Sequence, residues 1–431
     1  MKRLILFELI ILFLATTFES DSPPGWFQQN IPVNKIINDI FFIDSSNGWA
    51  VTAGGSSASD TAFILNTTNG GTNWLIQKTG IEQLDAVQFI DNNTGYAVGK
   101  LFLTTFLSIY KTTNSGINWT GLNNISGLGP TDIYFVNKDT GWIAASENST
   151  GGLYKTTNGG LNWSQQLSGS FGPSKLFFIN KDTGWAACQN TNLYRTTNGG
   201  GVWTLQFTSE YTIESLYFLD KFKGWMRGGY IANTMGVAYT TDGGFSWTNA
   251  QGEVGGFDIK FVNDSIGYSG MINNKITKSR DGGKIWGYQT SPVYSNLSTV
   301  MFKSDTLNGW AGGTGIVHTT DGGGSLILGI TQTSTETPSE YKLYQNYPNP
   351  FNPVTNIKYS IMPNVKSQMS KVLLSVFDVT GKEVAILVNT KQNTGTYLAD
   401  WNASGFASGI YFYSLLIDGK AIDTRRMVLV K

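Results

Sequence analysis

The sequence Lys-Thr-Thr-Asn-Gly-Gly-Leu-Asn-Trp at residues 155–163 recurs with small changes along most of the chain. Five further copies also end in tryptophan, and a seventh, Thr-Thr-Asp-Gly-Gly at residues 319–323, has Leu326 where the tryptophan would stand. The closing residues are 45, 44, 40, 44 and 39 positions apart, at Trp74, Trp119, Trp163, Trp203, Trp247 and Trp286. A repeat of this length, with room for four short strands, is typical of a β-propeller blade.

A second marker keeps the same period. Glycine followed by tryptophan or tyrosine occurs once per repeat, with the aromatic residue at Trp49, Tyr96, Trp142, Trp185, Trp225, Tyr268 and Trp310. Each pair follows an apolar segment that ends in phenylalanine, at Phe42, Phe89, Phe135, Phe178, Phe218, Phe261 and Phe302. These segments, the Gly-aromatic segments and the two arms of the Gly-Gly hairpin supply four strands per unit. Seven such units predict an all-β, seven-bladed β-propeller.

The chemistry of the hairpin explains why it repeats. The Asn or Asp at its third position, such as Asn158 or Asp242, can hydrogen-bond the backbone of its own turn. The glycines that follow allow positive φ, and the tryptophan covers the turn. These are the features of an Asp-box, which residues 240–247 match most fully. We expect no helix after the Gly-Gly pairs, so a phosphate-binding loop is not predicted.

The N-terminal segment is expected to close the ring. Trp-Phe-Gln-Gln at residues 26–29 resembles Trp-Ser-Gln-Gln at residues 163–166, which follows a hairpin. Because the seventh hairpin lacks its tryptophan, residues 21–30 are predicted to pair with the strand before His318, with Trp26 over that hairpin. Closure in this way removes the unpaired edge between the first and last blades. The propeller is predicted to span residues 21–325.

Composition argues against several classes of function. Lys plus Arg and Asp plus Glu both number 30, so no net charge attracts nucleic acid or an anionic membrane. The single cysteine, Cys188, is expected to be a buried hydrophobe rather than a reactive thiol. The single histidine, His318, argues against a His-based metal site or a Ser-His triad. We therefore expect no metal, no cofactor and no catalytic residue.

The chain begins with a predicted export signal. Lys2 and Arg3 precede an apolar stretch that is too short to span a bilayer, which predicts a secretory signal peptide at residues 1–20. An uncleaved anchor is the alternative. No cysteine follows the stretch, so a lipoprotein anchor is excluded, and no transmembrane segment is expected after signal removal. Farther along, residues 326–340 are polar and outside the repeat, and they are predicted to form a linker.

Residues 341–431 form a different kind of domain. Alternating apolar residues predict strands at 357–361, 372–377, 384–388, 396–401 and 410–417, and a small immunoglobulin-like β-sandwich is the expected fold. This piece closely resembles the type A sorting domain of the type IX secretion system. The motifs that carry the resemblance include Tyr-Gln-Asn-Tyr-Pro-Asn-Pro-Phe-Asn-Pro at 344–353, Val-Thr-Gly-Lys-Glu-Val at 379–384, Ser-Gly-Ile-Tyr-Phe at 408–412 and Thr-Arg-Arg-Met-Val-Leu at 424–429. The resemblance implies contact with the secretion machinery, passage through the periplasm, and secretion or display on the outer cell surface.

Residues 26–325 resemble the propellers of the photosystem II stability and assembly factor family. The Gly-Trp-Ala-Val and Thr-Thr-Asn-Gly-Gly-x-Asn-Trp sequences carry this likeness, which extends to sialidases and xyloglucan-degrading propellers that share Asp-boxes. Because Asp-boxes are structural, the resemblance implies a fold more than a function. A photosystem-assembly role would also be expected to require a basic patch, which is missing.

The sequence favours a binding protein over an enzyme. A sialidase-like site needs a cluster of arginines around a carboxylate, and the propeller has only Arg195, Arg227 and Arg280. A glycosidase needs two facing carboxylates, whereas most aspartates here fall in the turn before a Gly-aromatic pair. We expect a non-catalytic binding module with an unknown extracellular protein or glycan ligand. The alternatives are an extracellular glycoside hydrolase acting on polysaccharide and a purely structural surface protein.

The candidate ligand site lies at the mouth of the predicted channel. Acidic residues begin the innermost strands of five units, at Asp39, Asp85, Asp132, Glu214 and Asp258, with Lys175 as the exception. The first, third and fifth of these stand three residues before the strand-ending Phe and should converge best, while Asp85 and Glu214 stand four before it and could point into loops. Converging carboxylates would raise one another's pKa and attract a cation or a Lys/Arg-bearing partner. The alternative is a solvated rim without a ligand.

Overall fold

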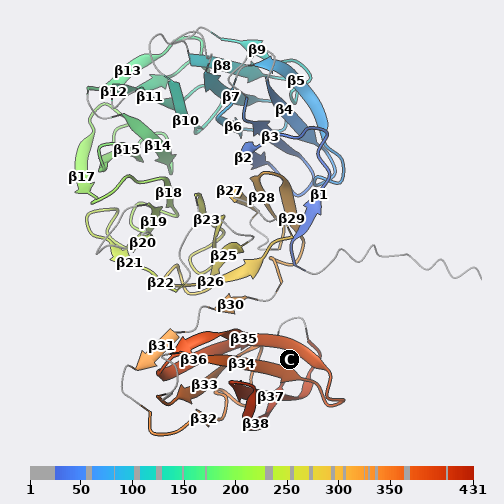
Figure 1. Ribbon diagram of the computed structural model, residues 1–431. Helices are drawn as coiled ribbons and strands as arrows, with labels where there is room; N and C mark the ends of the chain where they lie inside the picture. The colour runs from blue at the N-terminus through green and yellow to red at the C-terminus, as the bar shows by residue number, and fades with distance from the viewer. Residues whose placement is uncertain are drawn as a thin grey trace, which may run out of the picture.

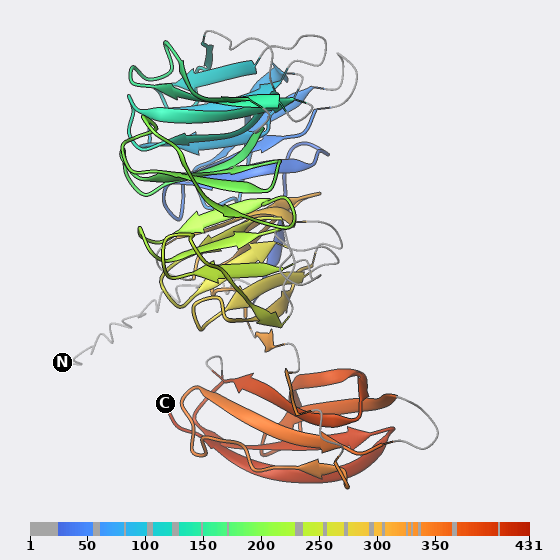
Figure 2. The ribbon, with the colours of Figure 1, turned by 90° about the vertical axis from the view of Figure 1, so that its left-hand side faces the viewer.

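The computed structural model describes residues 25–54, 61–81, 83–100, 107–122, 129–147, 150–169, 172–228, 236–252, 257–270, 275–292, 297–303, 307–324, 326–328, 331–334, 338–363, 369–403 and 406–431. Within these ranges the chain forms 38 β-strands and no helix, which confirms the all-β prediction and leaves no helical segment there that could cross a membrane. Seven sheets form a ring around a channel, and two further sheets form a smaller domain beyond its rim (Figures 1 and 2). The predicted signal peptide lies outside the described residues.

Each sheet of the ring contains one blade of four antiparallel strands, taken from the channel outward, and the blades confirm the seven-bladed propeller. Blade 1 contains β2 (Ile37–Phe42), β3 (Gly48–Thr52), β4 (Ala62–Thr67) and β5 (Leu75–Ile81). Blade 2 contains β6 (Ala86–Phe89), β7 (Gly95–Lys100), β8 (Leu107–Thr112) and β9 (Thr120–Gly121). Blade 3 contains β10 (Gly129–Phe135), β11 (Gly141–Glu147), β12 (Thr150–Thr156) and β13 (Ser164–Gly169). Blade 4 contains β14 (Pro173–Phe178), β15 (Gly184–Cys188), β16 (Asn192–Thr196) and β17 (Thr204–Thr208).

The remaining blades follow the same plan. Blade 5 contains β18 (Ser215–Phe218), β19 (Gly224–Arg227), β20 (Val237–Thr240) and β21 (Thr248–Asn249). Blade 6 contains β23 (Ile259–Phe261), β24 (Gly267–Gly270), β25 (Lys275–Ser279) and β26 (Ile285–Thr290), and its outer strand also pairs with β22 (Gln251–Gly252) and β30 (Ile327–Leu328). Blade 7 contains β27 (Leu297–Phe302), β28 (Gly309–Gly313), β29 (Ile316–Thr319) and, as its outer strand, β1 (Phe27–Gln29).

The two sequence markers of each repeat pack against each other across the seam between blades. The strand-ending Phe of one blade stacks on the Gly-aromatic ring of the blade before it, and this happens at all seven seams with ring centroids 3.4–3.7 Å apart. The glycine is required because the Phe ring of its own blade lies over it. A Cβ at Gly48, for example, would lie 2.4 Å from a ring atom of Phe42. The repeat therefore specifies contacts between blades as well as within them.

The Asp-box hairpin has the hydrogen bonds that its sequence predicts. In blade 1 the Thr67 hydroxyl accepts a hydrogen bond from the Gly71 N–H (2.8 Å), and the Asn69 side chain accepts one from the Asn73 N–H (2.9 Å). Gly70 and Gly71 have φ values of 68° and 91°, which residues with a Cβ atom rarely adopt. The turn therefore depends on this residue pattern.

The N-terminal segment closes the ring, as predicted. Strand β1 pairs antiparallel with β29, and Phe27 lies opposite His318. Trp26 is buried over the seventh hairpin, where its Nε1–H donates a hydrogen bond to the Gln289 side chain (3.2 Å). Trp74 makes the equivalent hydrogen bond to Gln29 at the next seam (3.1 Å). Trp26 thus takes the place of the tryptophan that the seventh hairpin lacks.

The C-terminal domain is a two-sheet β-sandwich, as predicted. One sheet contains β31 (Thr331–Ser334), β36 (Gly395–Asn402), β33 (Val354–Ile361) and β32 (Lys342–Leu343), in that order. The other contains β35 (Glu383–Asn393), β34 (Met369–Phe377), β37 (Gly409–Ile417) and β38 (Lys420–Leu429). A core that includes Trp401, Tyr359 and Tyr413 lies between them. The predicted linker at 326–340 contains two strands, since β30 pairs with blade 6 and β31 pairs with the sandwich.

Candidate functional site: the propeller channel

The innermost strands of the seven blades surround the centre of the ring (Figure 1), and their side chains line one cavity, the channel. In four blades a β-bulge interrupts the start of this strand, between Ile37 and Asp39, Pro130 and Asp132, Pro173 and Lys175, and Leu297 and Thr299. The extra residue stands four positions before the strand-ending Phe, and the residue after the bulge stands three before it. A bulge re-aims neighbouring side chains, so both positions can take part in contacts around the channel.

The three aspartates that stand three residues before the Phe each join two blades. Each accepts a hydrogen bond from a backbone N–H of the next blade: Asp39 from Val87 (2.9 Å), Asp132 from Leu176 (2.8 Å) and Asp258 from Val300 (3.2 Å). Each also accepts one from the N–H of the residue that follows it, at 2.9–3.0 Å. Since unpaired buried N–H groups are costly, these carboxylates stabilise the ring as well as lining its channel.

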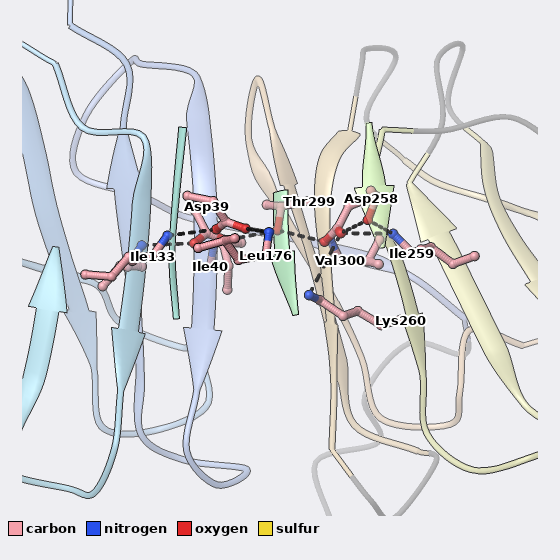
Figure 3. A network of polar contacts seen from close by, with 12 residues as sticks. Asp39, Ile40, Ile133, Leu176, Asp258, Ile259, Lys260, Thr299 and Val300 are labelled. Carbon is pink, nitrogen blue, oxygen red and sulfur yellow. Dashed lines mark hydrogen bonds and ion pairs between the residues drawn. The ribbon is translucent and has the colours of Figure 1, made fainter. Parts of the chain in front are cut away.

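Hydroxyl groups extend this network around the channel (Figure 3). The Thr299 hydroxyl lies 3.3 Å from a carboxylate oxygen of Asp39 and 3.5 Å from one of Asp258. Ser215 donates to Asp258 (2.8 Å) and accepts from the Ile259 N–H of the next blade (3.1 Å). The carboxylates of Asp39 and Asp258, which are distant in the sequence, therefore both lie next to the Thr299 hydroxyl.

The other two acidic residues, Asp85 and Glu214, stand four residues before the strand-ending Phe, and their surroundings differ from each other. Asp85 lines the same cavity as the three aspartates, and its carboxylate accepts a hydrogen bond from the Gln83 side chain (2.5 Å). Glu214 does not join them. Its carboxylate pairs with the buried guanidinium of Arg227, which lies over the Phe257 ring. The prediction of one common mouth is therefore corrected for Glu214, because a buried arginine on strand β19 holds its carboxylate.

Two lysines, Lys175 and Lys260, line the channel beside the aspartates. The Lys260 ammonium lies 3.9 Å from Asp258 (Figure 3), and although burial acts against it, attraction to Asp258, Asp39 and Asp132 raises the pKa of Lys260. Burial raises the pKa of Asp39 to about 6, against the Val87 hydrogen bond and Lys260, which lower it. Burial also raises the pKa of Asp132. Acidic and basic groups thus offset part of one another's charge in the channel.

A belt of aromatic side chains lies on the face of the innermost strands that also carries the aspartates. The position one before the strand-ending Phe carries an aromatic residue in four blades, at Phe41, Tyr134, Phe177 and Tyr217. The Phe177 ring centroid lies 5.4 Å from that of Tyr134 and 4.9 Å from that of Tyr217. The belt, the four aspartates and the two lysines line one cavity of about 330 Å³. Such a cavity offers apolar surface next to carboxylates.

The structure brings together four of the five acidic residues that the sequence singles out, and their role in binding remains a prediction. The sequence reasoning missed Lys260. The sequence does contain a signal for it, because Lys260 stands at a position that is aromatic in four other blades. Across the described ranges, no group of three or more His, Cys, Asp or Glu side chains is placed to hold a metal ion.

Family comparisons agree with the two domains. Residues 19–176 match the family described as photosynthesis system II assembly factor YCF48, and residues 345–430 match the secretion system C-terminal sorting domain. The chain therefore combines a YCF48-like propeller with a type IX sorting domain, which directs its export to the cell surface or the medium. The comparison with curated proteins found no match.

Solved structures that resemble the chain are propellers. YCF48 bound to a D1 peptide has 20% identity and a TM-score of 0.55, covering 69% of this chain and 97% of that one. YCF48 from Cyanidioschyzon merolae has 18% identity and a TM-score of 0.54, covering 68% and 98%. The WD40 propeller of Doa1 has 13% identity and a TM-score of 0.52, covering 68% and 96%. At these identities the likeness is one of fold alone.

Proposed function

We propose that the propeller is a non-catalytic binding module at the cell surface or in the medium, and that its channel accepts a cationic group of an extracellular protein. The observation that carries the proposal is the cavity bordered by Asp39, Asp85, Asp132 and Asp258 next to the aromatic belt. Four carboxylates against two ammonium groups leave an excess of negative charge there. A carboxylate that accepts two hydrogen bonds still has lone pairs for another donor.

The dimensions of the cavity favour a side chain as the bound group. A volume of about 330 Å³ is at the small end of ligand pockets, which suits one lysine or arginine side chain. Its apolar stem would contact the aromatic belt while its charge meets a carboxylate. Lys260 already places an ammonium beside Asp258 in this cavity. YCF48, a structural relative, binds a D1 peptide, which supports a peptide as the ligand class.

The same geometry argues against the hydrolase alternative. A glycosidase acting on polysaccharide needs two carboxylates that flank a bond in an open cleft. Asp39 and Asp132 instead hold the N–H groups of neighbouring blades, inside a channel of small volume. We therefore do not assign hydrolysis to this site.

Replacing Asp85 tests the channel while keeping the three aspartates that accept backbone hydrogen bonds from the next blade. Hexalysine is expected to bind the full-length secreted protein, and Asp85→Asn should weaken binding by about 1 kcal/mol, a factor of about five, because one carboxylate is lost. Isothermal titration calorimetry measures both, and binding should weaken further in high salt. Asp182→Asn is the control, because Asp182 is an exposed turn residue paired with Lys181. The proposal fails if hexalysine does not bind or if both variants bind it equally.

Binding of hexalysine should also depend on pH. The pKa of Asp39 is raised to about 6, so lowering the pH from 7.5 to 5 adds a proton to this carboxylate and removes a negative charge from the channel. Asp132, whose pKa burial also raises, adds to the change in the same direction. The affinity should therefore fall as the pH falls through about 6, while lysine side chains stay charged throughout. An affinity that stays constant across this interval would contradict a role for Asp39.

A further inference from the structure

A long cationic side chain crosses four of the seven seams between blades. It stands on the third strand, just before the hairpin, and donates a hydrogen bond to a backbone carbonyl of the next blade. The four bonds are Lys111 to Gly159 (3.0 Å), Lys155 to Gly199 (2.7 Å), Arg195 to Lys221 (3.3 Å) and Lys278 to Gly322 (2.8 Å). In each case the cation also lies over the Gly-aromatic ring of its own blade. The side chain therefore fills the seam.

At the seam between blades 7 and 1, His318 occupies this position. Its ring stacks on Trp310, with centroids 4.6 Å apart, and lies 5.0 Å from the ring of Phe27. The Gly70 carbonyl, which a lysine would reach, accepts hydrogen bonds from the Trp310 and Gln29 side chains instead. His318 Nε2 has no hydrogen-bond partner among the described residues, and burial lowers the pKa of His318 to about 4. A short, neutral side chain thus replaces a long, charged one.

An open cavity of about 520 Å³ lies at this seam. Within the described ranges, every residue that lines it is uncharged at neutral pH. The lining groups include the amides of Asn30, Asn69 and Asn308, the hydroxyls of Ser46 and Thr72, and the ring of Phe27. The cavity also borders the outer strand β1, whereas the channel lies along the innermost strands.

We propose that this seam is a second binding site, specific for a neutral sugar. Amide and hydroxyl groups both donate and accept hydrogen bonds, as sugar hydroxyls require, and an aromatic ring can pack on the apolar face of a sugar. The described part of the lining carries no charge, which disfavours ionic ligands, because a charged ligand would lose hydration without gaining a counter-charge from these residues. The volume falls within the range of small-molecule pockets and suits a mono- or disaccharide.

Placing a lysine at position 318, in the seam between blades 7 and 1, gives the most direct test. Maltose, cellobiose, lactose and N,N′-diacetylchitobiose would be titrated separately, each up to about 10 mM, against the full-length protein by calorimetry. We expect at least one to bind and His318→Lys to weaken it about tenfold or more, because the lysine fills the seam and can donate to Gly70 as its counterparts do. The variant should melt at the same temperature or higher. Hexalysine binding should not change, which distinguishes this site from the channel.

Two controls make the outcome decisive. Lys155→His makes the reciprocal change at the seam between blades 3 and 4 and should leave sugar binding unchanged. Asn30→Ala removes an exposed lining amide without filling the cavity and should weaken binding about threefold, which decides the matter if His318→Lys does not fold. The proposal is overturned if none of the four sugars binds, if a folded His318→Lys variant binds as the unmodified protein does, or if Asn30→Ala has no effect.

Discussion

Trp26→Ala should lower the free energy of unfolding of the propeller by about 3 kcal/mol, as truncation of a large buried aromatic side chain commonly does. Trp26 is buried over the seventh hairpin, and its ring also packs edge-on against Phe302, with centroids 5.7 Å apart. Its loss would leave a cavity and remove the hydrogen bond to Gln289. Thermal unfolding followed by near-ultraviolet circular dichroism would show the change as a lower melting temperature.

A neighbouring residue supplies the control for this experiment. Gln28 lies on the same strand, but its side chain is exposed, and its backbone pairs with Val317 whatever side chain it carries. Gln28→Ala should therefore change the melting temperature little. Equal stabilities for the two variants would mean that Trp26 does not hold the ring closed.

Removal of the sorting domain should abolish export while leaving the propeller folded. The deletion should cover residues 331–431, since cutting at 341 would leave β31 without its partner strand β36. All seven blades, including β1, lie before the deleted part, so the truncated chain should fold and accumulate in the periplasm. Immunoblots of periplasm, cell surface and medium would locate it, in a host that has the type IX system.

The reciprocal experiment fuses residues 331–431 to a reporter protein that normally stays in the periplasm. The fusion should leave the periplasm if the sorting domain is sufficient for export. Detection of the truncated propeller in the medium or on the cell surface, without cell lysis, would contradict the assignment of export to the sorting domain.

The repeat made the propeller predictable because its marker residues form the contacts between blades. The phenylalanine of each unit stacks on the aromatic residue of the preceding unit and covers the glycine of its own, so the spacing of these markers alone reveals the number of blades. Closure by Trp26 was predictable for the same reason, since one tryptophan was missing from the pattern and one stood outside it. The sandwich was less completely predictable. Strand β38 has many exposed polar residues, and of its side chains only Met427 and Leu429 are buried, so its apolar pattern is weak.

The channel was predictable only in part. Asp39, Asp132 and Asp258 all stand three residues before the strand-ending Phe. Side chains at equivalent positions of equivalent strands point the same way, so these three were expected to converge in the channel. The bulges before Asp39 and Asp132 cannot be read from this pattern, and neither can the backbone N–H groups of the next blade that donate to these carboxylates. For Glu214, in the other register, the sequence left both the channel and a loop open. Its partner, Arg227, lies on another strand, and such pairs appear only once strands are aligned.

Closure by β1 also has a consequence for the timing of folding. Strand β1, the first of the described strands, pairs with β29, which is made only after the four strands of each other blade. Contacts between such distant segments form slowly, because a long loop must close first. Blades 1–6 can assemble in order as the polypeptide emerges, while β1 waits without a partner. A full ring can therefore exist only when the whole repeat array has been delivered, just before the sorting domain itself emerges.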